Sequence, residues 1–134
     1  MLAIKREQRQ KVGEPAFEDR TVEYCRLVIG HHVEMLDDRE LLLRVRHCIA
    51  KARSYGLTWE SSISIFVTHM LSINPEFDKH PAIQRVLQDE AIPVDDRMAA
   101  MLGFVFDDDW DEAATQCDPK EYWAKIDRNE AKEI

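Results

Sequence analysis

Apolar residues recur every three or four positions along most of the chain, which is the spacing of amphipathic α-helices. A half-buried strand would show alternating polar and apolar residues, and only residues 61–65 (SSISI) approach this pattern. This segment lies inside a longer stretch with helical spacing, so a helix is predicted there as well. The pattern therefore predicts an all-α protein, a single compact bundle of about six helices with short loops. The residues predicted to face the core are Phe17, Tyr24, Cys25, Val28 and Ile29; Leu41, Leu42, Val45, Cys48, Ile49, Ala52 and Tyr55; Ile63, Phe66, Val67, Met70 and Leu71; Ile83, Val86 and Leu87; Met98, Met101, Leu102 and Val105; and Tyr122, Trp123 and Ile126.

Capping residues and prolines mark the ends of these helices. Asp37 followed by Glu40 has the spacing of a capping box, and Gly56 follows where a left-handed residue closes the helix. Thr58 is the predicted N-cap of the next helix, which Asn74-Pro75 ends. The other signals are Asp78 or His80 before Pro81, a break at Ile92-Pro93, Asp95 as the cap of a fifth helix, and Asp118-Pro119 at the start of the last one.

The chain is predicted to form one helical domain over residues 1–134. Its 134 residues match the commonest size of a single domain, and 45% hydrophobic positions are enough for one core. We expect a short N-terminal helix over 4–11, a break at Gly13-Glu14-Pro15, core helices over about 16–106 and an acidic C-terminal segment over 107–134.

Neither the first residues of the sequence nor its longest uncharged run has the pattern of a secreted or membrane-spanning protein. Residues 1–10 lack the apolar run of a signal peptide. The longest uncharged run, residues 61–75, is shorter than the roughly 20 apolar residues of a bilayer span. Three widely spaced cysteines, Cys25, Cys48 and Cys117, indicate reduced thiols. We therefore expect a cytoplasmic protein in which Cys25 and Cys48 are small core residues.

The formal net charge of −8 is concentrated in the second half of the chain. Residues 1–60 hold eleven Lys and Arg against ten Asp and Glu, whereas residues 61–134 hold seven against sixteen. Nucleic-acid binding requires basic groups that displace phosphate counterions, and anionic membranes attract the same groups. The charge therefore argues against nucleic acid and membrane as partners, and it favours a partner with a basic surface.

No motif in the sequence specifies a reaction, a metal or a cofactor. Neighbouring His31 and His32 point about 100° apart on a helix and cannot easily share an ion, and His69 lies at the edge of an apolar stripe. Zinc, di-iron and calcium-loop spacings are missing, as are nucleophile elbows and glycine-rich phosphate loops. We expect no catalytic residue, no metal and no cofactor, and therefore a protein that is not an enzyme.

One acidic run stands out as a candidate binding site. The favoured interpretation is structural: carboxylates at a helix N-terminus offset the helix dipole, which explains one or two acids well and five poorly. The sequence-based hypothesis is a docking patch for a basic partner, with the tryptophan as its aromatic anchor. The patch consists of Asp107, Asp108, Asp109, Trp110, Asp111 and Glu112.

Several short motifs, taken in order, resemble one family. They are Phe17-Glu18-Asp19-Arg20, Ala52-x-x-Tyr55-Gly56-Leu57-Thr58-x-Glu60, Phe66-x-x-x-Met70, Phe77-Asp78-x-x-Pro81 and Val86-Leu87. Over residues 4–90 the chain resembles small helical proteins of Gram-negative bacteria that are encoded beside type VI secretion spike, tip and effector genes. The resemblance implies a cytoplasmic, non-enzymatic accessory protein that handles an effector or its carrier.

Two protein-binding functions follow as hypotheses. The first is an adaptor or chaperone that binds a secreted effector or its spike or tip carrier before export. The alternative is an immunity protein that neutralises a cognate bacterial toxin, since an acidic surface suits a basic toxin. A metal-assisted enzyme using residues 107–112 is the third and least favoured hypothesis.

Overall fold

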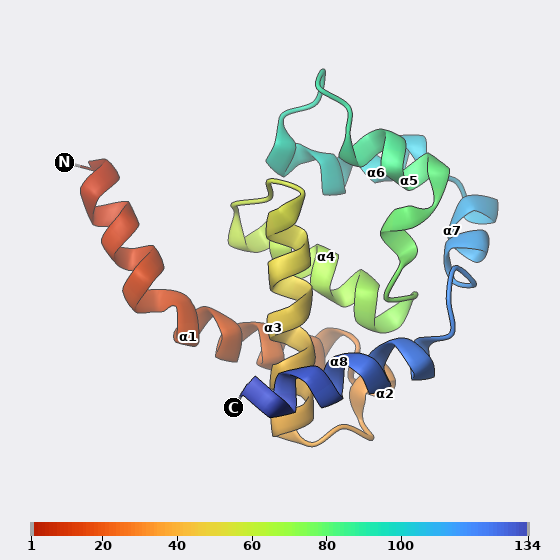
Figure 1. Ribbon diagram of the computed structural model, residues 1–134. Helices are drawn as coiled ribbons and strands as arrows, with labels where there is room; N and C mark the ends of the chain where they lie inside the picture. Colours follow the sequence, from red (N-terminus) through yellow and green to blue (C-terminus); the bar gives the residue numbers. More distant parts are fainter. Residues whose placement is uncertain (1, 134) are drawn as a thin grey trace.

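The computed structural model describes the backbone of residues 2–133 and the side chains of residues 14–128. Eight α-helices and two short 3-10 helices, with no strand, make up this part of the chain (Figure 1). The prediction of an all-α bundle is therefore confirmed. The elements are α1 (Leu2–Val28), α2 (Gly30–Val33), α3 (Asp38–Ser54), α4 (Glu60–Ser72), η1 (Phe77–Lys79), α5 (Pro81–Leu87), η2 (Val94–Asp96), α6 (Arg97–Phe104), α7 (Asp107–Ala113) and α8 (Pro119–Glu133).

Helix α3 is the centre of the bundle. It packs against α1, α4 and α8, while α5 and α6 pack on each other beyond the far end of α3 (Figure 1). Its stripe of buried side chains supplies much of the core, which continues into α8 through Trp123. The largest fully buried side chains include Phe66 and Phe77, whose rings lie 5.0 Å apart. Burial of this apolar surface drives the fold.

Several predicted caps are confirmed because they depend on local sequence alone. The Asp37 carboxylate accepts a hydrogen bond from the Glu40 N–H at 2.8 Å, so Asp37 is the N-cap of α3. Gly56 has a φ of +90°, the left-handed conformation that ends α3 without a steric cost. His80 caps α5, since its Nδ1 accepts from the Ala82 N–H at 3.1 Å. Pro119 is the first residue of α8.

The prediction that Thr58 caps α4 is wrong, because the side chain of Asp95 caps this helix instead. Asp95 Oδ1 accepts from the backbone N–H groups of Thr58 and Trp59 at 2.8 and 2.9 Å and from the Ser62 hydroxyl at 2.6 Å. Its Oδ2 accepts from the Thr58 hydroxyl at 2.6 Å. Asp95 therefore caps α4, although it lies 37 residues after Thr58 in the sequence. The prediction that Asp95 caps the helix that follows it, α6, is wrong, because Asp96 is the N-cap residue of α6.

Helix α1 differs from its prediction at both ends. The expected break at Gly13-Glu14-Pro15 is helical, so the short helix over 4–11 is part of α1. A proline inside a helix removes one hydrogen bond and bends the axis without necessarily ending the helix, and the axis of α1 changes direction in Figure 1. At the other end, the apolar pattern predicts a helix that runs from about residue 16 to about residue 35. The observed α1 ends at Val28, because Ile29 leaves helical geometry and is the N-cap of the short α2.

Some residues predicted to face the core do not. Tyr24, Val28 and Leu102 are exposed, while Leu42 is only half-buried and its neighbour Leu43 is buried instead. Periodicity identifies the apolar side of a helix, but it cannot show whether another element covers all of that side.

Candidate functional site

The acidic run forms α7, at one edge of the molecule (Figure 1). Asp107, Asp108 and Asp111 are exposed, and no ion pair engages them among the side chains of residues 14–128. Asp109 has a local role, because its Oδ2 accepts from the Phe106 N–H at 3.1 Å where α7 begins. Three of the five acids are therefore free to meet a partner.

Trp110 holds α7 on the core. Its ring is partly buried and meets the edge of the His69 ring at 5.3 Å between centroids, and His69 in turn packs on Phe77 at 5.4 Å. Burial lowers the pKa of His69 to about 4, so the ring is neutral near pH 7. Trp110 is thus used in packing, and the partner-binding role of residues 107–112 stays a prediction.

Glu112 lies in the one cluster within the described chain that has the donor types of a metal site. Its Oε2 is 2.6 Å from Nε2 of the buried His80, and Asp109 lies close enough to complete a set of three. However, His80 Nδ1 accepts the Ala82 N–H, which leaves the proton of a neutral ring on Nε2. That proton is donated to Glu112, so Nε2 has no free lone pair for an ion. The cluster is better explained as a link between α7 and α5.

An apolar ridge beside α7 is the surface that sequence analysis missed. Leu102, Phe104 and Phe106 are 91%, 60% and 68% exposed. The chain leaves helical geometry at Val105, whose φ and ψ of −117° and 121° are extended. Side chains alternate in an extended segment, so Val105 points into the core while its two neighbours point outward. We call Leu102, Phe104 and Phe106 the apolar ridge.

A second apolar surface lies where α1 meets the start of α3. An open groove of about 670 Å³ is lined by Val22, Leu27 and Leu42 and by the charged residues Asp19, Glu23, Arg26 and Asp38. Leu27 is 85% exposed, and Met35 in the loop before α3 is 90% exposed. We call this the α1–α3 groove. In Figure 1 the start of α3 lies at the lower end of the bundle, whereas α6 lies near its upper end and α7 at its right-hand side.

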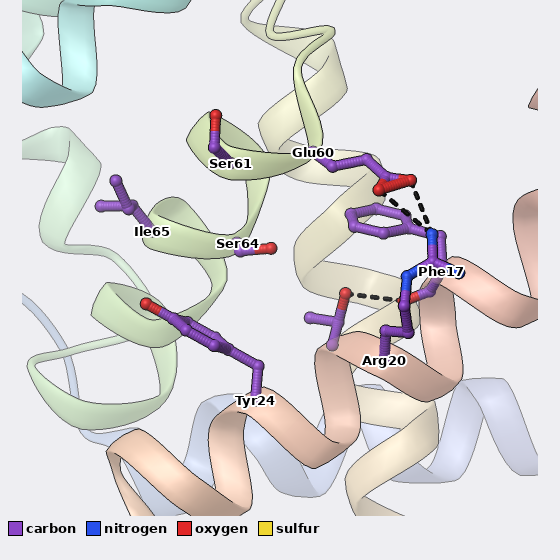
Figure 2. A pocket seen from close by; sticks show the side chains of 8 residues that line it. Phe17, Arg20, Tyr24, Glu60, Ser61, Ser64 and Ile65 are labelled. Carbon is purple, nitrogen blue, oxygen red and sulfur yellow. Dashed lines mark hydrogen bonds and ion pairs between the residues drawn. The ribbon is translucent and has the colours of Figure 1, made fainter.

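The other side of α1 carries a smaller pocket of about 350 Å³ against α4 (Figure 2). The Arg20 guanidinium bonds both Glu60 oxygens at 2.7 and 3.1 Å at one end, and Tyr24 reaches toward α4 at the other. Phe17 and Arg20 come from one of the motifs behind the family resemblance, and Glu60 comes from the next. These motif residues therefore join α1 to α4.

Two further motif residues meet inside the protein. The Tyr55 hydroxyl donates to Asp78 Oδ2 at 2.5 Å, and Lys51 Nζ lies 3.0 Å from Asp78 Oδ1. Gln84 Nε2 donates to the Tyr55 oxygen and to the Asp78 carbonyl. The Asp78 carboxylate is buried, and its partners are Lys51 of α3 and Tyr55, the C-cap of α3. Gln84 of α5 adds bonds to the Tyr55 oxygen and the Asp78 carbonyl, so this network joins η1 to the end of α3 and to α5.

The cysteines have the properties of structural residues. Cys25 and Cys48 are buried, as predicted. Burial raises the pKa of Cys25 to about 12 and raises that of Cys48 as well, so both remain thiols near neutral pH. A thiol is a poor nucleophile, which makes both residues unsuited to covalent chemistry.

Comparison of the chain with protein-family models, with curated proteins and with solved structures gave no match. No helix in the described part of the chain combines the length and apolarity of a bilayer span. The resemblance to proteins encoded beside type VI secretion genes therefore stays a prediction.

Proposed function

We propose that this chain is a cytoplasmic, non-enzymatic protein-binding accessory protein, an adaptor or chaperone for a type VI secretion effector or its spike or tip carrier. The observation that carries the proposal is the presence of two separate apolar surfaces, the apolar ridge at α6–α7 and the α1–α3 groove. An apolar patch left in water costs free energy, and such patches mark binding sites for other proteins.

Two surfaces suit an adaptor better than a protein with one partner. An adaptor holds the effector and the carrier at once, which requires binding faces that do not overlap. The ridge and the groove lie on different helices at different ends of the bundle (Figure 1). The family resemblance suggests the two partners: a type VI secretion effector and its spike or tip carrier.

An immunity protein is the second candidate, and the exposed acids of α7 are the observation that favours it. Asp107, Asp108 and Asp111 surround the start of a helix next to apolar side chains. Such a surface captures a basic toxin quickly by charge and holds it by apolar contacts. An immunity protein needs this one surface only.

Co-expression with the effector and the spike protein encoded beside the gene separates these functions. An adaptor co-purifies with both proteins, and it leaves cells that express the active effector unprotected. An immunity protein co-purifies with the toxin alone and keeps the cells alive. Recovery of the chain without either protein would contradict both proposals.

A further inference from the structure

We propose that the apolar ridge and the exposed acids of α7 form one docking surface for a cationic amphipathic segment of a partner protein. This inference rests on the proposed protein-binding function and names the chemistry of the partner. The surface consists of Leu102, Phe104 and Phe106 together with Asp107, Asp108 and Asp111.

The apolar part lies within a short stretch of sequence, in which Gly103 and the buried Val105 separate the three exposed side chains. Three bulky side chains emerge within five residues because α6 ends at Phe104 and the chain runs extended into α7. Aromatic and leucine side chains of this kind supply most of the binding free energy at protein interfaces when a partner covers them. On this chain they face solvent, which leaves that free energy available for binding.

The charged part determines which partner fits. No Lys or Arg occurs between Arg97 and Lys120, while six Asp and Glu lie in that interval. Among the side chains that the structure describes, no ion pair neutralises Asp107, Asp108 or Asp111. A second copy of this chain would bring like charges together, and nucleic acid would do the same. A segment with Lys or Arg beside apolar residues satisfies both parts of the surface.

The surface is held in shape before a partner arrives. Trp110 packs on His69, Glu112 bonds His80 and Asp109 caps the first turn of α7. These three contacts involve Trp110, Glu112 and Asp109, and they hold the α7 backbone from which the exposed acids project. A preorganised surface loses little conformational entropy on binding. The partner's cations can also stack on the faces of Phe104 and Phe106.

The test uses two synthetic helical peptides with the same leucine stripe, one flanked by lysines and the other by glutamates. We expect the purified full-length chain to bind the lysine peptide in fluorescence-anisotropy titrations and to bind the glutamate peptide at least tenfold more weakly. Backbone amide NMR signals of residues 102–111 should shift on addition of the lysine peptide. Rising salt should weaken the binding because the charged groups are exposed.

Two variants separate the apolar and the charged contributions. Phe104→Ser with Phe106→Ser, and Asp107→Lys with Asp108→Lys and Asp111→Lys, should each weaken binding at least tenfold. The control variants, Met35→Ser and Glu34→Lys with Glu90→Lys, change exposed residues elsewhere and should leave the affinity within about twofold. Thermal melts followed by circular dichroism check that each variant is folded. If a ridge variant does not fold, the NMR shifts of the wild-type chain show whether the lysine peptide binds at residues 102–111.

The docking surface is overturned by failure of the lysine peptide to bind, by equal binding of both peptides, or by NMR shifts centred on the α1–α3 groove. Retention of the natural partners by the ridge variants in co-expression would also overturn it, while leaving the proposed protein-binding function intact. Failure of the wild-type chain to bind any natural partner would instead count against the proposed function.

Discussion

Leu41 and Leu42 are neighbours in α3 with different surroundings. Leu41 is fully buried in the core, whereas Leu42 lines the open α1–α3 groove. We expect Leu41→Ala to lower the free energy of unfolding by about 2–5 kcal/mol, because it leaves a cavity, and Leu42→Ala to lower it by less than about 1.5 kcal/mol. Urea unfolding of the two variants measures the difference. Equal losses would mean that the groove is closed in solution.

The Asp95 carboxylate stabilises the start of α4. Burial alone would raise its pKa, but hydrogen bonds from Ser62, Thr58 and the Trp59 N–H outweigh this effect and hold the pKa at about 2. We expect Asp95→Ala to cost about 1–2 kcal/mol of stability, as for the loss of a helix cap. Asp96→Ala, a change at the exposed neighbour, is the control and should cost less than about 0.5 kcal/mol. Similar losses in both variants would contradict the capping role.

His69 should make stability depend on pH. Its pKa is about 4 in the folded protein and 6.5 for an ordinary histidine, so the unfolded chain takes up the proton first as the pH falls. Protonation therefore favours unfolding, and stability should drop between about pH 6.5 and pH 4 by up to about 3 kcal/mol. Urea unfolding across this range measures the drop. His69→Phe should reduce it and the exposed His31→Gln should not, whereas an unchanged profile in His69→Phe would refute this account.

At the scale of elements, local chemistry was enough to predict most helices and several of their ends. Asp37, Gly56 and Pro119 act through neighbouring backbone groups, so their roles can be read from sequence. The α4 cap could not be predicted, because Asp95 reaches it only after folding. The apolar ridge could not be predicted either, because Phe104 and Phe106 point outward only as a result of the extended backbone at Val105.

The link between His80 and Glu112 should hold α7 in place. Removing the ring by His80→Ala takes away this hydrogen bond and the α5 cap, while Glu112→Gln keeps the side-chain shape and weakens only the link. We expect Glu112→Gln to speed amide hydrogen exchange in α7 without changing exchange in α4. Unchanged exchange in α7 would show that Trp110 alone suffices to hold the helix.

At the scale of the whole molecule, charge and apolar surface are arranged together. The second half of the chain carries the excess of acids, and the ridge lies within it. The sequence was sufficient to identify the acidic run, and the structure exposes Asp107, Asp108 and Asp111. The sequence-based hypothesis took Trp110 as the anchor for a partner, but its ring packs against His69 inside the protein. Periodicity could not predict the α1–α3 groove. The groove exists because no other helix packs over these residues, and this depends on the arrangement of the whole molecule.

The central claim is that two separate surfaces each hold a different protein. The direct test is native mass spectrometry of complexes purified after co-expression with the two proposed partners, a secretion effector and a spike protein. We expect one assembly of three different polypeptides for the wild-type chain. Phe104→Ser with Phe106→Ser should lose one partner, and Leu27→Ser with Leu42→Ser should lose the other. Loss of the same partner in both variants, or of neither, would contradict the claim.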